Sequence, residues 1–408
     1  MKRTLITNIG MLATPQGTAA RGGRAQGEIC ILKNAWIFIE NDVIAQVGTG
    51  TAPAAADAQT INAGGKLVTP GLVDAHTHLI FDGWRQNELA LKLHGAGYLD
   101  ILAAGGGILS TMRATQSASE EQLEAKASAA LDEMLRFGTT TAEAKSGYGL
   151  STGEECKALR VIGKLQKHHV MDLAATFMGA HAVPEAYRDN RQGYLELLCE
   201  EMLPAVREQG IAEFCDVFCE KGVFSAEESR RILLTGRQHG LRPKIHADEI
   251  EAIGGSELAG EIGAVSAEHL IVCPPSGIAP MAEGGTVACC LPATSFYLGA
   301  AYAPVQDMVQ AGVPVAMATD FNPGSCPCLN MQLVISLGCL RYRLTPEQAL
   351  TAVTLNGAAA ICRADRIGSI EPGKQADILI WNAEDLDYIC YRLGSNLVDT
   401  VIKKGNVV

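Results

Sequence analysis

The stretch Leu72-Val73-Asp74-Ala75-His76-Thr77-His78-Leu79-Ile80 combines apolar residues with two histidines that are separated by one threonine. In a β-strand, residues i and i+2 lie on the same face, so the two imidazoles would point in one direction. On a helix the same spacing would separate them by roughly 200° around the axis. Apolar β-branched neighbours and the preceding Thr69-Pro70-Gly71 break favour the strand. The stretch therefore predicts an extended segment that presents a histidine pair to one ligand.

Further apolar, β-branched segments follow it, and longer helical patterns separate them between about Lys66 and Ile335. This alternation is typical of βαβ units in a parallel sheet. Strands that are each followed by a helix close most simply into a (β/α)8 TIM-like barrel, so we expect an α/β fold of this kind. The expected strands are Leu72–Leu79, Thr139–Ala144, Leu173–Ala180, Phe214–Cys219, Pro243–His246, Ala264–His269, Thr286–Leu291 and Val313–Thr319.

The two ends of the chain have a different pattern, with short alternating strands and loops rich in Gly, Ala and Pro. Short strands are expected around Ile31–Phe38, Val43–Val47, Ala376–Trp381 and Val398–Lys403. We expect both ends to pair into one small β-sandwich beside the barrel. The predicted division is a composite β-sandwich of residues 1–65 plus 371–408 and a barrel of residues 66–370.

Composition excludes several classes of protein. With 408 residues, 48% of them hydrophobic, the chain can bury one large core and a smaller second one. No apolar run approaches the roughly 18 residues of a membrane span, and the N-terminus becomes polar too soon for a signal peptide, so we expect a cytoplasmic protein with no membrane partner. A net charge of −12 argues against nucleic acid as a partner. The 13 cysteines follow no regular framework and predict reduced thiols.

Polar residues gather at the expected carboxyl ends of the strands, where the active sites of such barrels lie. More than half of the 9 histidines fall there. We therefore expect the functional site at this mouth of the barrel. In chain order the strand ends carry His76 and His78, Glu143 to Tyr148, His181, Glu220 or Lys221, His246 and Glu249, His269, Thr294 and Ser295, and Asp320 and Asn322.

Four of these side chains, His76, His78, His246 and Asp320, form a candidate metal site. Three imidazoles and one carboxylate suit Zn²⁺ or Fe²⁺ better than Mg²⁺ or Ca²⁺. A cation held in this way lowers the pKa of a bound water toward about 7 and polarises a carbonyl, which is the chemistry of hydrolysis at neutral pH. The ligand set predicts a hydrolase that uses zinc or iron, and ligand type alone does not decide between these metals.

Proton transfer needs groups that do not give their lone pairs to the metal, and Glu249 and His269 meet this condition by position. Glu249 follows His246 by three residues, where the strand should turn into its loop, so we expect it to act as the general base. His269 is expected to orient the nucleophile or to stabilise an oxyanion. Which of Glu249, His269 and Asp320 carries each proton transfer stays open. Asp248 and Glu251 are expected to be solvated loop charges.

The segment Val68–His78, together with His246, His269 and Thr319-Asp320, resembles the amidohydrolase superfamily. More narrowly, nearly the whole chain is similar to the imidazolonepropionase family of histidine degradation. HxH alone is a generic motif, but the combination is specific. The motifs that carry the similarity are Asn87-Glu88-Leu89 to Gly105-Gly106-Gly107-Ile108, Lys145–Leu150, Gly179–Pro184, His246–Glu249 and Thr319–Ser325.

This resemblance implies hydrolysis of a cyclic amide C–N bond, which opens the ring of 4-imidazolone-5-propanoate and yields N-formimidoyl-L-glutamate. Arg85 also meets a requirement of the chemistry, because a guanidinium can bind the propionate of such a small anionic substrate in bidentate fashion. Carried over residue by residue, the resemblance implies His76, His78, His246 and Asp320 as metal ligands, and Arg85, Tyr148, His181, Glu249, Asn322, Gly324 and Ser325 around the substrate.

One departure from the superfamily concerns the fourth strand, which ends in Cys219-Glu220-Lys221. Dinuclear members use a carbamylated lysine there to bridge two metals, whereas Lys221 is shifted and Gly222 follows at once. We therefore expect one zinc or iron ion per chain, and Glu220 stays open as an additional ligand. No motif specifies the oligomeric state, so a homodimer is expected only as the commonest closed assembly.

Two alternative functions stay open. The same barrel and a His-x-x-Glu arrangement also serve metal-dependent deaminases of nucleobase-like rings, although Arg85 and Tyr148 argue against this activity. An inactive barrel that acts as a scaffold would be free to lose its ligands, yet every expected ligand is present. Release of ammonia from an aminated ring would distinguish a deaminase from a ring-opening hydrolase.

Overall fold

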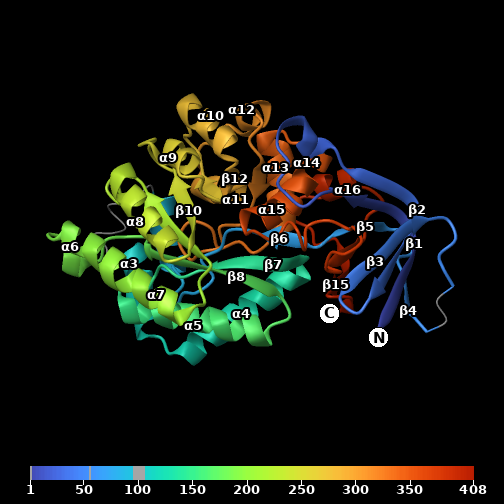
Figure 1. Cartoon of the computed structure of the whole chain (residues 1–408), viewed down its shortest axis with the longest axis horizontal. Coiled ribbons are helices and arrows are strands. Elements are labelled where there is room, and N and C mark those ends of the chain that lie inside the picture. The colour runs from blue at the N-terminus through green and yellow to red at the C-terminus, as the bar shows by residue number, and fades with distance from the viewer. Residues whose placement is uncertain (1, 55–56, 95–105) are drawn as a thin grey trace.

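The computed structural model describes residues 2–54, 57–94 and 106–408. Gly105, one glycine of the motifs noted above, lies outside these residues. In Figure 1 the barrel strands lie within a layer of helices, and a separate sheet stands beside them near both chain ends. This arrangement confirms the barrel and the separate terminal sheet expected from the sequence.

Eight parallel strands form the barrel, and each pairs with its neighbours in sequence order. Their interior-facing positions are filled by buried side chains, as in other barrels of this class. The strands are β6 (Leu72–Asp74), β7 (Thr139–Lys145), β8 (Asp172–Ala180), β9 (Phe214–Cys219), β10 (Arg242–Ala247), β11 (Ser266–His269), β12 (Val287–Cys290) and β13 (Val315–Met317).

The ring closes between β6 and β13, just beyond the carboxyl ends of these two strands. Thr77 and Phe321 form an isolated parallel bridge there. The amide of Asp320 donates a hydrogen bond to the carbonyl of His76 at 3.1 Å, and the amide of His78 donates to the carbonyl of Phe321 at 2.9 Å. The closure therefore runs through the residues of the predicted metal site.

The first strand is shorter than expected, because β6 ends at Asp74 and not at Leu79. The Asp74 carboxylate accepts hydrogen bonds from the amide and the hydroxyl of Thr319, at 3.0 and 2.6 Å, so side-chain bonds replace ladder bonds at this point. The chain still runs extended beyond it, since the amide of Lys145 in β7 donates to the carbonyl of Thr77 at 3.0 Å. The histidine pair is thus presented as predicted, although the regular strand stops before it.

Helices connect the strands and cover the outside of the barrel (Figure 1). They are α1 (Leu89–Leu93), α3 (Ile108–Ser117), α4 (Glu120–Arg136), α5 (Thr152–His168), α6 (Arg191–Glu196), α7 (Leu203–Gln209), α8 (Ala226–Gln238), α9 (Gly255–Glu261), α10 (Pro275–Gly284), α11 (Pro292–Leu298), α12 (Val305–Gln310), α13 (Met331–Tyr342), α14 (Pro346–Ala352), α15 (Leu355–Ala360) and α16 (Leu386–Tyr391). Short turns are η1 (Gly23–Gly27), η2 (Gln86–Glu88), η3 (Glu185–Tyr187) and the π-helical η4 (Leu197–Met202).

Helix α4 shows how local sequence sets these elements. The Ser119 hydroxyl accepts from the amide of Gln122, and the Gln122 side chain accepts from the amide of Ser119, which forms a capping box. The helix ends at Phe137, and Gly138, with a φ of 95°, lets the chain turn directly into β7. Its buried face follows helical spacing, with Leu123, Ala127, Leu131 and Met134 packed against the barrel core.

The terminal sheet joins strands from both chain ends in the order β16-β15-β14-β5-β1-β2-β3, and β4 pairs with β1. It has its own hydrophobic cluster, which includes Ile6, Ile37 and Ile378. Strand β5 belongs to this sheet, two residues beyond the predicted boundary at residue 65, and the exact domain boundaries stay a prediction. The strands are β1 (Arg3–Thr14), β2 (Cys30–Glu40), β3 (Val43–Thr49), β4 (Gln59–Asn62), β5 (Leu67–Pro70), β14 (Ile378–Trp381), β15 (Val398–Lys403) and β16 (Asn406–Val407).

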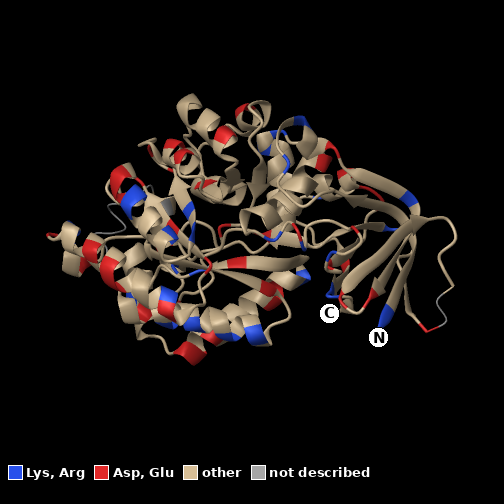
Figure 2. Cartoon of the chain, viewed as in Figure 1, with Lys and Arg blue, Asp and Glu red and all other residues tan. Residues whose placement is uncertain are grey.

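The surface and the cysteines agree with the composition. Figure 2 shows basic and acidic residues interspersed along the outer helices, with no continuous basic band in this view of the described chain. All 13 cysteines are free. Among the residues that the structure describes, no helix is long and apolar enough to cross a membrane.

Ion pairs connect the terminal sheet to the barrel. The ammonium of Lys403 lies 2.7 Å from a carboxylate oxygen of Asp172, at the start of β8, and 2.7 Å from one of Asp377. Lys404 contacts the other oxygen of Asp172 at 2.6 Å. Burial opposes ionisation of Asp172, but the charge and hydrogen bonds of Lys403 lower its pKa from 3.8 to about 2.

Replacement of Asp172 by Asn is expected to reduce the free energy of unfolding by about 1 kcal/mol at pH 7, a value discounted because the Asp172 side chain is 37% exposed. Because the pKa of Asp172 is lower in the folded state than in the unfolded state, its ionisation stabilises the folded protein above about pH 4. This contribution is lost as the pH falls toward about 2. Urea denaturation of both proteins at several pH values measures the difference. Asp189→Asn, which alters an exposed aspartate, is the matched control. Equal stabilities at pH 7 would contradict the expected effect.

Candidate metal centre and active site

Four predicted ligands meet at the carboxyl mouth of the barrel. Oδ1 of Asp320 lies 3.4 Å from Nε2 of His76 and 3.5 Å from Nε2 of His78. Nε2 of His246 lies 3.3 Å from Nε2 of His78. His76 and His78 follow β6, His246 lies on β10, and Asp320 follows β13, so segments far apart in sequence supply one cluster of donor atoms.

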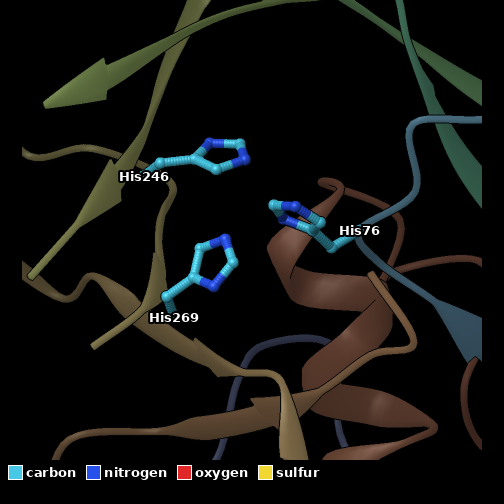
Figure 3. Close-up of side chains that lie close together, drawn as sticks. All are labelled: His76, His246 and His269. Carbon is cyan, nitrogen blue, oxygen red and sulfur yellow. The ribbon is translucent and has the colours of Figure 1, made fainter. Parts of the chain in front are cut away.

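His269, at the end of β11, belongs to the same cluster. Figure 3 shows the rings of His76, His246 and His269 around a common space. Their centroids are 4.6 Å (His76–His246), 5.1 Å (His246–His269) and 5.6 Å (His76–His269) apart. Two sets of donor atoms are close enough to hold an ion, one from His76, His246 and His269 and the other from His76, His78 and Asp320.

The backbone at this mouth is held in sparsely populated conformations. Asp320 has a φ of 57°, His269 of 68° and Asp248 of 52°, and none of them is a glycine. Residues other than glycine seldom adopt this left-handed region, and such strain collects at functional sites because the surrounding fold must enforce it. The barrel thus fixes where these side chains point.

Buried donor atoms in this cluster are left without protein partners. Nε2 of His76 and Oδ1 of Asp320 have no hydrogen-bond partner among the described residues, whereas Oδ2 of Asp320 accepts a hydrogen bond from the Thr294 hydroxyl at 2.7 Å. Burial lowers the pKa of His76 and of His78, which keeps both imidazoles neutral with lone pairs available. Unpaired buried polar atoms are costly, so three imidazoles and one carboxylate fit a divalent cation of the zinc or iron type.

Carboxylates behind the cluster orient two of the imidazoles. Nδ1 of His76 lies 2.8 Å from Oε2 of Glu268, and Nδ1 of His246 lies 3.1 Å from Oδ1 of Asp216. Each Nδ1 can donate to its carboxylate, which leaves Nε2 free to bind a cation. Sequence reasoning missed Glu268 and Asp216. The sequence pattern that could have indicated them is a charged residue within an otherwise apolar strand, at a position that faces the barrel interior.

Glu249 reaches the cluster from the loop after β10. Its carboxylate lies 3.6 Å from Nε2 of His269, and its side chain is 15% exposed. Burial, with the nearby charges of Asp320 and Glu220, raises the pKa of Glu249 to about 8. Burial also raises the pKa of Asp320 to about 6. Glu249 therefore holds a proton more readily than an exposed glutamate does.

Glu220 and Lys221 have other partners. The Glu220 carboxylate accepts hydrogen bonds from the amides of Lys221, Ile250 and Glu251, at distances of 2.8 to 3.1 Å, and so shapes the loop that carries Glu249. The Lys221 ammonium pairs with the exposed Glu251 at 2.9 Å. Glu251 is a surface charge, as expected.

The expectation that Asp248 is a solvated loop charge is wrong. Its side chain is fully buried, and burial raises its pKa. The cause is tertiary packing: the amide of Val272 donates to the carbonyl of Asp248 at 2.9 Å and draws this loop against the segment that follows β11. The sequence contains no sign of this contact.

Tyr148 and His181 line the space next to His78. The imidazole of His181 stacks on that of His78, with centroids 4.8 Å apart and planes 19° from parallel. The ring of Tyr148 is 5.1 Å from His181 and 4% exposed as a residue. Nδ1 of His181 lies 3.0 Å from the carbonyl of Gly147, so it donates there and leaves Nε2 unprotonated. Burial lowers the pKa of His181 to about 3.

Arg85 lies at the edge of the same space. Its guanidinium forms a bidentate pair with Glu88, with both N–O distances at 2.9 Å, and its side chain is 13% exposed. A side chain at position 324 would collide with this guanidinium, so Gly324 provides room for Arg85. Glu88, which the sequence analysis did not assign to the site, also accepts a hydrogen bond from the amide of Gly107 at 2.7 Å.

Asn322 and Ser325 build the loop that carries Gly324. Oδ1 of Asn322 accepts from the amides of Gly324 and Ser325, at 2.8 and 2.7 Å, and its amide group donates to the Ser325 hydroxyl at 2.8 Å. The same amide group donates to the carbonyl of Asp320 at 2.7 Å. Asn322 thus ties this loop to the backbone of Asp320, and the predicted contacts of Asn322, Gly324 and Ser325 with a substrate stay a prediction.

The chain is similar to known proteins over its full length. The amidohydrolase family model matches residues 67–408. An imidazolonepropionase of Alkaliphilus metalliredigens (strain QYMF) is 50% identical over 100% of this chain and 98% of its own length. An imidazolonepropionase of Bacillus cereus (strain G9842) is 48% identical over 100% of this chain and 97% of its own length.

Solved structures share the fold at low identity. The guanine deaminase of E. coli superposes with a TM-score of 0.75 at 16% identity, over 100% of this chain and 99% of that protein. A zinc-bound adenosine deaminase from Xanthomonas campestris gives 0.70 at 20% identity, over 99% and 92%. Such identities show the fold alone. The full-length relatives and the family match show more: the chain belongs to the amidohydrolase family and, within it, to the imidazolonepropionases.

Proposed function

We propose that the chain hydrolyses the ring of 4-imidazolone-5-propanoate to N-formimidoyl-L-glutamate, a step of histidine degradation. The observation that carries this proposal is the convergence of His76, His78, His246 and Asp320, with Glu249 beside them, in a chain half identical to proteins named imidazolonepropionase. The reaction adds water across a cyclic amide C–N bond: oxygen bonds to the carbonyl carbon, and a proton passes to the departing ring nitrogen.

In this proposal His76, His78, His246 and Asp320 hold one zinc or iron ion per chain. When bound, such a cation lowers the pKa of water toward about 7 and polarises a carbonyl oxygen. Glu220 is not among the proposed ligands, because backbone amides already occupy its carboxylate.

Glu249 is assigned the central proton transfer. It takes a proton from the attacking water and delivers it to the ring nitrogen, and the pKa raised by burial makes the protonated carboxyl a stable intermediate state between the two transfers. His269, 3.6 Å from this carboxylate, orients the water or stabilises the developing oxyanion. Asp320 acts as a ligand, and whether it also accepts a proton is left to the Glu249 test below.

The anionic end of the substrate is assigned to Arg85. Its guanidinium, held by the Glu88 carboxylate, lies beside Gly324 and would donate hydrogen bonds to the carboxylate of a small substrate. Tyr148 and His181 flank the ring, and the loop of Asn322, Gly324 and Ser325 closes the space around the substrate. A homodimer and a cytoplasmic location are further parts of the proposal, and they come from the sequence analysis.

Glu155, on α5, supports this substrate pocket from behind. Its buried carboxylate accepts hydrogen bonds from the amides of Gly147, Gly149 and Leu150, at 3.1, 2.8 and 2.8 Å. These residues surround Tyr148, and Gly147 also binds His181 through its carbonyl. The carboxyl group of Glu155 therefore holds the loop that carries Tyr148 and the carbonyl that binds His181.

Substitution of Glu249 by Gln is expected to lower kcat by about 10²–10⁴-fold and to leave the metal content unchanged, because the amide cannot exchange the proton. The disappearance of freshly prepared 4-imidazolone-5-propanoate measures turnover, and elemental analysis measures the metal. Glu251→Gln, in the same loop but paired with Lys221 at the surface, serves as the control. Unchanged turnover would remove Glu249 from this role, and ammonia release from aminated rings would favour a deaminase.

Substitution of Glu155 by Gln is expected to raise KM by about tenfold with the metal content unchanged. A glutamine offers one acceptor oxygen where the carboxylate offers two, so at least one buried amide loses its partner and the Tyr148 loop shifts. Steady-state kinetics measure this. The adjacent Glu154→Gln, which removes only an ion pair with Lys157, should leave KM unchanged. If Glu155→Gln has a wild-type KM, the loop does not depend on this carboxylate.

Removal of the metal with a chelator is expected to abolish turnover, and addition of zinc or iron is expected to restore it. Elemental analysis of the active protein should give close to one equivalent per chain. A value close to two equivalents would contradict the single site, and full activity of metal-free protein would contradict the proposed chemistry.

A further inference from the structure

A continuous chain of charged groups runs through the barrel interior behind the proposed metal ligands. It begins at His76, whose Nδ1 contacts Glu268 at 2.8 Å, and Lys244 lies 3.4 Å from the other oxygen of Glu268. It ends at His246, whose Nδ1 contacts Asp216, and Lys145 lies 2.7 Å from Asp216.

Glu143 joins the two halves of this chain. One carboxylate oxygen lies 2.9 Å from the Lys244 ammonium, and the other lies 2.7 Å from the Lys145 ammonium. Glu143 and Lys145 are two residues apart in β7, so both face the barrel interior. The full order is His76–Glu268–Lys244–Glu143–Lys145–Asp216–His246, with strands β7, β9, β10 and β11 contributing.

The five charged groups between the histidines are all completely buried. A buried charge costs several kcal/mol unless it is paired and hydrogen bonded, so each member depends on its neighbours. Three carboxylates and two ammonium groups leave a formal charge of −1 next to the proposed cation site. The arrangement thus combines orientation of two imidazoles with an electrostatic field that favours a cation.

We propose that Glu143 is a positioning residue for the metal, although it contacts neither histidine. The inference rests on the proposed metal site. Glu143 is the shared partner of both lysines. Without it, Lys145 would have only Asp216 as a carboxylate partner, and Lys244 would have only Glu268. Asp216 and Glu268 then keep the acceptor capacity that fixes His246 and His76 with Nε2 toward the cation.

Lys244 also links these charged groups to the backbone of the barrel. Besides its two carboxylate partners, it donates to the carbonyls of Ala75 and Ala360, at 3.2 and 3.3 Å. Ala75 immediately precedes the ligand His76 in the chain. A shift of the Lys244 ammonium therefore reaches His76 by two routes, through Glu268 and through the backbone.

The test is the metal affinity of Glu143→Gln, measured by competition with a chromogenic chelator. The amide removes the negative charge and keeps one acceptor oxygen, so at least one of the two ammonium groups loses its contact with residue 143. We expect zinc affinity to fall by at least tenfold, and we expect the visible spectrum of the cobalt-substituted protein to change. Glu143→Asp keeps the charge but is too short to reach both lysines, so an intermediate loss is expected.

Asp377→Asn is the matched control. It removes a buried carboxylate from Lys403 in the terminal sheet and so destabilises the fold, but it changes none of the charged groups between His76 and His246. It should bind zinc and cobalt as the unmodified protein does. Folded Glu143 variants with zinc affinity within twofold of the unmodified protein would overturn the proposal. So would failure of both Glu143 variants to fold, because the residue would then serve the whole barrel.

His246→Ala distinguishes this inference from the proposed metal site itself. If His246→Ala binds zinc normally, the metal site is wrong and the role of Glu143 is wrong with it. If His246→Ala loses zinc but Glu143→Gln does not, the metal site stands and only the present inference is wrong.

Discussion

The barrel closes through hydrogen bonds between the backbone of His76 and His78 and the backbone of Asp320 and Phe321, and the rest of the site depends on this closure. The same short segments carry three of the four proposed ligands. The fold therefore cannot complete its ring without bringing these donor atoms together. In energetic terms, the cost of crowding imidazoles and a carboxylate in a dry space is met by the cooperative stability of the whole barrel.

Low solvent access gives these groups their chemistry. Burial lowers the pKa of His76 and His78, so their nitrogens stay neutral, and it raises the pKa of Glu249 to about 8. The same environment would make unpaired charges costly, which explains why the layer behind the site alternates carboxylates and ammonium groups from Glu268 to Asp216. Burial is thus the common cause of the raised pKa of Glu249 and of the ion pairs that orient His76 and His246.

The sequence was sufficient for the barrel because periodicity and strand-end polarity follow local rules. It placed His76, His78, His246 and Asp320 at one mouth, where the structure brings them together. It was not sufficient where tertiary contacts override local pattern. β6 stops at Asp74 because side-chain bonds to Thr319 replace its ladder, and Asp248 is buried because a neighbouring loop covers it. The interior charges of β7 and β10 gave only a weak signal, since a lysine in a strand does not reveal its partner.

The most direct measurement is anomalous X-ray scattering from crystals of the purified protein, recorded at the zinc and iron absorption edges. The account predicts one anomalous peak per chain, within about 2.0–2.2 Å of an imidazole nitrogen from each of His76, His78 and His246 and of a carboxylate oxygen of Asp320. A peak bound by Glu220 or Lys221, two peaks at this mouth, or a metal located elsewhere in an active protein would contradict the account.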